Sequence, residues 1–452
     1  MSSLSFFPHH FRNRAFPAGS LGSRHRPRAG AVGCRCLVAF VLLAALPAPA
    51  QEALRNSLAG DAAAEARKIR LESLPYTVKS GDFRLLVVPS LGLDWNDNVN
   101  ISRTNAQQDF ILSPQMQLDA SYPITQNNVL SLNVGVGYNK YFDHEQYSAW
   151  FMQSGTELSF DIYAKDFWFN LHDRVNYVQD TSQQAALAGT ATYATLNNTA
   201  GFSVTWDLNK ATLSAGYDHE NVITPSSQQS TPSSQQSSGS QDRATEMIFA
   251  RAGLEVYPGT IAGIEGTGAF TTYDQMVLND NNSYSAGVYA DWQPGKAFRV
   301  QPRVGYSITK IQHTSQTIQT ADMNSWYFDL NMTHQVTDAI SYSLDAGHEV
   351  QLGIQSDVME DWYVRPGINW NIIKNVGLNT SFSYEHGNQG AGNVAGNLTE
   401  NFDWFTTEVG ASYAILKKLS LGLNYRLTLR SSNNADREYM QNFVGLSLTY
   451  QP

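Results

Sequence analysis

Hydrophobic and polar residues alternate strictly along many stretches of this chain. In residues 419–430, LSLGLNYRLTLR, every second position from Leu419 to Leu429 is hydrophobic, and Ser, Gly, Asn, Thr and two Arg fill the positions between them. A period of two places the hydrophobic side chains on one face of an extended strand and the polar ones on the other. The pattern predicts β-strands whose two faces meet different environments.

Eighteen such segments recur between Phe83 and Tyr450. Most run ten to fourteen residues, whereas strands of soluble proteins usually run about five or six and a tilted membrane-spanning strand needs about nine to eleven. Segment 261–273 is rich in glycine and weak in alternation, which leaves sixteen strands as the alternative. We expect strands near 83–95, 109–122, 129–142, 150–163, 167–178, 195–208, 211–220, 244–257, 261–273, 282–292, 298–312, 324–336, 340–351, 359–372, 376–387, 402–415, 419–430 and 438–450.

The connections between these segments alternate in length. Tight turns such as 209–210, 374–375 and 416–418 follow the even-numbered segments, and longer polar stretches such as 179–194 and 221–243 follow the odd-numbered ones. This asymmetry is typical of a bacterial outer-membrane barrel, with short turns in the periplasm and long loops outside. An even number of strands returns both termini to the periplasm.

These observations predict an all-β fold, a transmembrane antiparallel up-and-down β-barrel of about 18 strands. Because lipid offers no hydrogen-bond partner to an open sheet edge, the strands must close on themselves. The leucines of 419–430 then face lipid and the arginines face a lumen. Aromatic residues near strand ends, such as Trp95 and Trp292, fit interfacial girdles. Asp173 falls on the lipid face of its segment, where we expect a bulge or a different register.

The N-terminus resembles a secretory signal peptide. Residues 1–35 contain six Arg and no acidic residue, the hydrophobic run CLVAFVLLAAL covers 36–46, and Ala48-Pro49-Ala50 supplies small residues for cleavage. We therefore expect the domains to be a signal peptide at 1–50, a periplasmic extension at 51–82 and the barrel at 83–452. A plug formed by the extension is the alternative for residues 51–82.

Composition and charge exclude several functions. Charged residues make up 15% of the chain, against about 25% in ordinary soluble domains. Loss of residues 1–50 removes both Cys and six Arg, and leaves 24 Lys+Arg against 40 Asp+Glu, a formal charge of −16. Such a chain has no thiol chemistry, and its acidity disfavours nucleic acid as a partner.

Searches for catalytic or metal-binding motifs identify none. Asp94 to Asn98 has the spacing that opens a calcium loop, but Val99 and Asn105 stand where Gly and Glu are needed. The histidines are scattered along the chain and do not form a zinc pattern. An enzyme that assembles Ser, His and Asp or Glu from different strands, near His172 or His386, is the third-ranked alternative. We expect no enzyme activity and no cofactor.

The predicted lumen-facing positions carry more acidic than basic residues. Such charges can keep a water-filled inner wall hydrated and pair across strands, or they can line a constriction that sets ion selectivity. The acidic positions are Asp94, Asp119, Glu157, Asp161, Asp207, Asp218, Glu220, Glu255, Glu265, Asp291, Asp329, Asp345, Glu349, Glu385 and Glu408. The basic positions are Arg84, Arg174, Arg251, Arg299, Arg303, Arg365, Arg426 and Arg430. The pore-lining candidates are Asp119, Glu157, Asp161, Asp207, Glu255, Asp291, Arg299, Arg303, Asp345, Arg365, Glu408, Arg426 and Arg430.

The first predicted hairpin, residues 92–122, resembles that of the putative β-barrel porins of the second type. It carries Asp97-Asn98-Val99 at the end of the first strand, and Asp109-Phe110 followed by Pro114 at the entry to the second. The resemblance implies an outer-membrane protein of the kind often associated with exopolysaccharide export. The last segment, 443–450, also resembles the terminal signal that the barrel-assembly machinery recognises, although Gln451-Pro452 extend past its aromatic residue.

We therefore expect a passive channel in the bacterial outer membrane, for saccharides or an exported polysaccharide. The alternative is a non-conducting structural or accessory barrel of an envelope or polysaccharide-export complex. The expected partners are outer-membrane lipid, the barrel-assembly machinery and proteins of such an export system.

The long polar segment at 221–243 supplies a test of orientation. It follows an odd-numbered strand and is too polar to pack in a core, so an epitope inserted near Ser230 should bind antibody on intact cells. Binding only after the outer membrane is opened would invert the predicted topology.

Overall fold

The computed structural model describes residues 72, 74–178, 185, 194–224, 242–275, 278–312, 321–353, 357–389 and 400–452. The expected signal peptide, most of the expected extension before residue 74, and the polar repeat at 225–238 lie outside the described residues. Residues 54–452 form one compact unit, and the description below concerns that unit alone.

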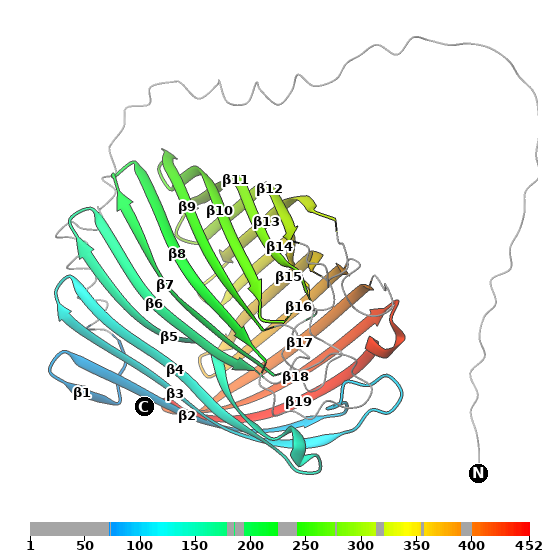
Figure 1. Ribbon diagram of the computed structural model, residues 1–452. Helices are drawn as coiled ribbons and strands as arrows, with labels where there is room; N and C mark the ends of the chain where they lie inside the picture. The colour runs from blue at the N-terminus through cyan, green and yellow to red at the C-terminus, as the bar shows by residue number, and fades with distance from the viewer. Residues whose placement is uncertain are drawn as a thin grey trace, which may run out of the picture. The chain divides into compact units, whose positions relative to one another are not determined.

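The described residues form a closed antiparallel barrel of eighteen strands, β2 to β19, with a short additional strand, β1. Each barrel strand pairs with the next in sequence, and β19 pairs with β2 to close the ring, as the succession of colours in Figure 1 shows. Eighteen strands are confirmed and the alternative of sixteen is wrong, because the glycine-rich β10 pairs fully with both neighbours. The strands are β1 Val78–Ser80, β2 Phe83–Asn96, β3 Asp109–Thr125, β4 Asn128–Tyr141, β5 Ala149–Ala164, β6 Phe167–Val178, β7 Thr195–Asp207, β8 Ala211–Ile223, β9 Arg243–Tyr257, β10 Thr260–Tyr273, β11 Asp280–Gly295, β12 Phe298–Gln312, β13 Met323–Gln335, β14 Ile340–Leu352, β15 Val358–Ile373, β16 Val376–Gln389, β17 Glu400–Leu416, β18 Leu419–Ser432 and β19 Tyr439–Tyr450.

The two ends of the barrel differ in the length of their connections. At one end, consecutive strands are joined by two to four residues, and at the other by five to nineteen. We call these the short-turn end and the long-loop end. Two 3-10 helices, η1 Glu145–Tyr147 and η3 Ala435–Arg437, lie in long-loop connections. Among the described residues, no helix has the length and hydropathy of a membrane-spanning helix.

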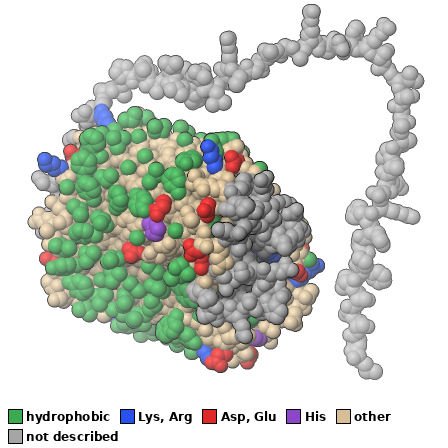
Figure 2. Space-filling model, viewed as in Figure 1, with side chains coloured by type: hydrophobic (Ala, Val, Ile, Leu, Met, Phe, Trp, Pro, Cys, Tyr) green, Lys and Arg blue, Asp and Glu red, His purple; other side chains and the backbone are tan. Residues whose placement is uncertain are grey.

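The hydrophobic face of each strand points away from the lumen. On β18, Leu423 is 53% exposed, whereas Arg426 and Arg430 on the other face are 7% and 3% exposed. Figure 2 shows hydrophobic side chains spread over the visible outer surface of the strands. A broad exposed apolar surface of this kind is stable only against lipid.

Bulky aromatic residues border this surface at two levels. Tyr284 and Trp292 on β11, and Trp362 and Trp370 on β15, are each eight residues apart on the outer face and 42–46% exposed. At about 3.3 Å per residue and a tilt of about 40°, eight residues separate two rings by roughly 20 Å. That spacing is close to the ~25 Å height of the apolar band of outer-membrane barrels.

Asp173 stays on the outer face without a bulge in its own strand. The β6–β7 ladder runs without a break through this position, and Asn198 donates a hydrogen bond of 2.6 Å to Asp173 Oδ1. The irregularity lies on the neighbouring β5, where the register shifts between Met152 and Thr156. The expected bulge therefore occurs one strand away.

The closing ladder between β19 and β2 is short. It pairs seven residues, Ser90 to Asn96 with Phe443 to Thr449. The edge of β2 that extends beyond β19 pairs instead with β1, through Phe83 to Leu85. Gly81, with φ +59°, makes the tight turn between β1 and β2. The expected extension thus contributes three residues, Val78–Ser80, that cover an otherwise open edge.

Circular closure predicts a heat-modifiable protein. Because every strand of the barrel ring is hydrogen-bonded on both sides, the folded form should resist SDS in the cold and migrate differently on a gel after boiling. Gel mobility is compared before and after heating. Identical mobility in both states, together with a mainly helical circular dichroism spectrum, would contradict the fold.

Candidate functional site

The lumen wall carries a charge cluster centred on Glu265 of β10, with partners on β9, β12 and β13. Its carboxylate accepts hydrogen bonds from Arg251 Nη2 at 2.8 Å, Arg303 Nε at 2.9 Å and the Tyr327 hydroxyl at 3.0 Å. The Glu265 side chain is 5% exposed, whereas those of Arg251 and Arg303 are 44% and 39% exposed. The buried carboxylate therefore orients two guanidinium groups that remain open to the lumen.

Glycines on the intervening strands let Tyr327 reach Glu265 from β13. A Cβ atom at Gly305 of β12 or Gly287 of β11 would collide with the Tyr327 ring or its hydroxyl. The ring therefore lies flat along the wall across two strands, as aromatic residues do when they cover glycine in sheets. Tyr363 of β15 lies over Gly347 in the same way, and its hydroxyl donates to Asp329 at 2.9 Å.

A second charge cluster lies on β14 to β16. Arg365 Nη2 donates to Glu385 at 2.7 Å, and Arg365 Nη1 lies 3.3 Å from Asp345 Oδ2. The guanidinium is 4.4 Å from the centroid of the Tyr363 ring, in cation–π geometry. Asp361 and Glu349 share this inward face, so acidic groups outnumber the single arginine here.

A third charge cluster is buried at the long-loop end. Glu400 of β17 pairs with Arg430 of β18 at 2.8 Å and with Arg437 of η3. These three side chains are at most 4% exposed. Burial, reinforced by the charge of Arg430, lowers the pKa of Arg437 to about 10, so its guanidinium is still protonated at neutral pH. Two cations therefore share one carboxylate away from water.

The other predicted pore-lining residues divide between pairs on the wall and turn contacts. Asp291 forms a two-point pair with Arg299 at 2.9 and 2.6 Å, and Glu157 lies 3.3 Å from Arg174. Asp207 is 2% exposed and accepts from the Asn209 backbone N–H, so it stabilises a short turn. Glu255 accepts a hydrogen bond from the Gly259 N–H, Asp161 accepts from Trp168 and Asn170, and Asp119 accepts from Gln117. Glu408 lies opposite Arg426 in the ladder, and the Arg426 guanidinium lies over the Phe443 ring.

The first long connection, residues 97–108, turns into the barrel. Ile101 at its centre is 6% exposed and packs in a buried cluster with inward-facing residues of β15, β17 and β19. The partners of Ile101 in this cluster are Met359, Phe402, Trp404, Tyr439 and Ala185 of another long-loop connection. The connection therefore narrows the lumen at the long-loop end.

The sequence did not indicate this inner cluster. Phe402, Trp404 and Tyr439 stand at positions of lumen parity, and alternation alone does not show that residues at such positions pack together. The signal that could have located the connection was Asp97-Asn98-Val99 at the end of β2, because buried Asn98 and Val99 begin the inward turn.

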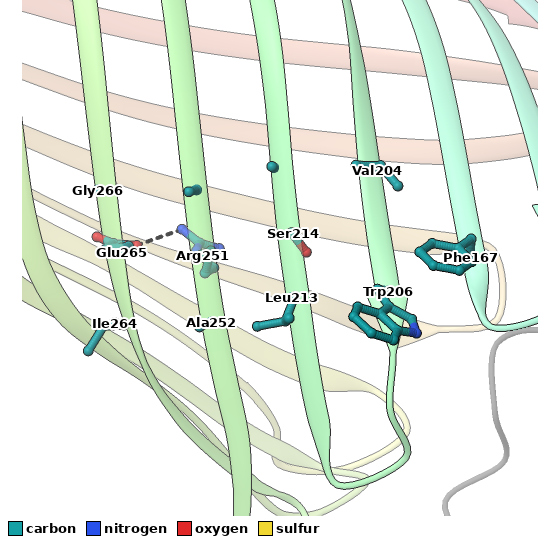
Figure 3. Close-up of a pocket in the computed structure, with 12 residues that line it drawn as sticks. Phe167, Val204, Trp206, Leu213, Ser214, Arg251, Ala252, Ile264, Glu265 and Gly266 are labelled. Atoms are coloured by element: carbon teal, nitrogen blue, oxygen red, sulfur yellow. Dashed lines mark hydrogen bonds and ion pairs between the residues drawn. The ribbon is translucent and has the colours of Figure 1, made fainter.

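Figure 3 shows how one stretch of wall serves two environments. Arg251 and Glu265 are joined across neighbouring strands, while Leu213 and Ile264 come from the alternate positions of β8 and β10. A shallow pocket of about 540 Å³ at this place is lined mainly by outward-facing apolar residues, among them Trp206 and Phe167. It belongs to the lipid-facing surface and not to the lumen.

The architecture defines a class of protein: a transmembrane barrel with an apolar exterior, a charged and paired inner wall, and a loop folded into one mouth. The family described as "Putative beta-barrel porin 2" matches residues 75–452. The chain belongs to this family.

The solved structures with similar folds include proteins of two Pseudomonas species. OccK2 (OpdF) of Pseudomonas aeruginosa is 9% identical, with a TM-score of 0.46, and the match covers 82% of this chain and 97% of OccK2. A BenF-like porin from Pseudomonas fluorescens Pf-5 is 13% identical, with a TM-score of 0.45, and the match covers 81% and 99% of the two chains. OccD3 (OpdP) of P. aeruginosa is 12% identical, with a TM-score of 0.44 and coverage of 86% and 97%. Among curated proteins, none matches significantly.

The Glu265 cluster predicts a stability effect. Glu265→Gln removes the charge that two arginines and Tyr327 share, so the free energy of unfolding should fall by about 1–3 kcal/mol. Urea titration of the protein in lipid vesicles measures the change. Glu157→Gln is the matched control: it breaks a half-exposed pair and should cost less than about 1 kcal/mol. Equal losses in the two variants would contradict the central role of Glu265.

Proposed function

We propose that this protein is a passive outer-membrane channel. The observation that carries the proposal is the half-exposed state of charged groups on the inward face. Arg251, Arg299 and Arg365 are 43–46% exposed, and barrels of sixteen to eighteen strands leave an aqueous lumen. Membership of a porin family supports the same function.

The proposal includes an orientation and a class of cargo. The long-loop end faces the outside and both termini lie in the periplasm, which the alternation of turn and loop lengths supports. The resemblance of the first hairpin to exopolysaccharide-associated porins supports saccharides or an exported polysaccharide as the solute, and proteins of such an export system as partners.

A catalytic role is less well supported than a channel. Both ring nitrogens of His172 are engaged, Nδ1 with Asn170 and Nε2 with Asp218, each at 2.9 Å. His386 contacts Asp403, which lies on the outer face of β17. Neither histidine has the free nitrogen facing a lumen hydroxyl that a serine nucleophile needs.

Single-channel recording in planar bilayers tests the proposed channel. Purified protein that shows heat-modified mobility should insert with steady conductance steps. Silence from such folded protein would favour the accessory barrel, which holds the envelope complex without conducting.

The charge pairs indicate the sign of ion selectivity. The inward arginines at 299 and 303 are matched by Asp291 and Glu265, and Arg426 and Arg430 are buried. They therefore do not form an open cationic ring, whereas Asp345 and Glu349 on β14 are acidic groups that remain open to the lumen.

We expect a mild cation preference at low salt that fades toward molar salt, because the Debye length is about 10 Å at 0.1 M and shortens to about 3 Å at 1 M. Reversal potentials across a potassium chloride gradient measure this preference. An anion-selective sign would show that an arginine constriction governs permeation.

A further inference from the structure

The Asp97-Asn98 pair makes specific contacts with the last strand of the barrel. The Asp97 carboxylate accepts from the Asn442 backbone N–H at 2.7 Å and from Asn442 Nδ2 at 2.6 Å, and the Asp97 N–H donates to the Asn442 carbonyl at 3.1 Å. Asn98 Nδ2 donates to the Met440 carbonyl at 2.9 Å, and Gln441 Nε2 donates to the Asn98 carbonyl at 2.9 Å. Two residues that follow β2 thus engage three consecutive residues of β19.

These contacts continue the shortest ladder of the barrel. The β2–β19 ladder ends at Asn96 and Phe443 after seven residue pairs. Asp97 and Asn98 extend the contact between β2 and β19 by two residues, through one backbone hydrogen bond and several bonds that involve side chains. The closure of the barrel and the path of the first connection are therefore held by the same groups.

Asn98 also shapes the turn that presents Ile101. Its side chain accepts from the Ser102 N–H and donates to the Ser102 carbonyl, both at 2.9 Å. Ile101 lies inside this turn with φ +48°, in the left-handed region. A β-branched residue is strained there, and such strain persists where surrounding contacts impose it. The imposing contacts are the Asn98 hydrogen bonds and the buried cluster around Ile101.

A surface ion pair completes the attachment further along the connection. Arg103 Nη1 lies 2.7 Å from Glu438 Oε2, next to the start of β19. The Arg103 side chain is 54% exposed, and an exposed pair contributes little stability. Asp97 and Asn98 therefore carry most of the attachment.

We infer that Asp97 and Asn98 form a latch that locks the 97–108 connection to β19 and holds Ile101 in the lumen, so that this connection sets the width of the channel. Release of the latch frees Ile101 from its strained backbone and opens the space in front of Phe402 and Trp404. The inference rests on the proposed channel function for its effect on conductance, but the latch itself can be tested without it.

Thiol labelling tests the latch directly. Both native cysteines, Cys34 and Cys36, lie within the expected signal peptide, so Ile101→Cys provides a single reporter in the processed protein. With the latch intact, the buried thiol should react slowly with a membrane-impermeant maleimide. Adding Asp97→Ala and Asn442→Ala should increase the labelling rate by about tenfold, as expected for the loss of one or two net hydrogen bonds.

The matched control is Asn105→Ala in the same connection. Asn105 is exposed, and it contributes only its backbone atoms to its bonds with the side chains of Ser102 and Asn100. This variant should leave the labelling rate unchanged. All variants must retain the heat-modified gel mobility of the parent, which separates loss of the latch from loss of the fold.

Conductance provides the second readout. The Asp97→Ala and Asn442→Ala variant should show larger and noisier single-channel steps than the parent and the Asn105 control. Fast labelling with the latch intact, or labelling that the latch variants do not change, would overturn the latch. Faster labelling with unchanged conductance would overturn its control of channel width. Silence of every protein, including the parent, would contradict the proposed function, while labelling would still decide the latch.

Discussion

The structure depends on one constraint: a strand in lipid must find all its backbone hydrogen-bond partners in neighbouring strands. Open edges are not tolerated in hydrocarbon, so eighteen strands close into a ring. Closure divides every strand into an outer and an inner face. The alternation seen in residues 419–430 follows from that division, because lipid selects leucine on one side and the lumen accepts arginine on the other.

The inner wall shows how charges are accommodated inside this ring. Most arginines on the wall bind a carboxylate on a neighbouring strand, and Glu265 serves two of them at once. Tyr327 and Tyr363 add hydrogen bonds where glycine clears their path, as Gly287 and Gly305 do for Tyr327. The pairing is not one to one, because two arginines share Glu265 while several carboxylates surround Arg365.

The sequence predicted the fold well, and the lumen only in part. Period-two alternation and connection lengths are local properties, so they predicted eighteen strands and the face of nearly every residue. Asp173 shows where the alternation pattern fails to predict local structure: it faces outward without a bulge in its strand, because Asn198 on the next strand donates a hydrogen bond to its carboxylate. The inner cluster around Ile101 could not be predicted, since it depends on a connection that turns inward and meets strands more than 250 positions away in sequence, such as β15 and β17.

In this fold the outer faces of the strands meet lipid and the inner faces meet water. Spin labels placed one at a time on cysteines along β12 test this division, because the processed chain is expected to contain no other thiol. Labels at Val300, Val304 and Tyr306 should be accessible to oxygen, and labels at Gln301 and Ser307 to a water-soluble nickel chelate. Alternation of the two accessibilities with a period of two is the predicted result. Nickel accessibility on both faces, or on neither, would contradict a lipid-embedded barrel with an aqueous lumen.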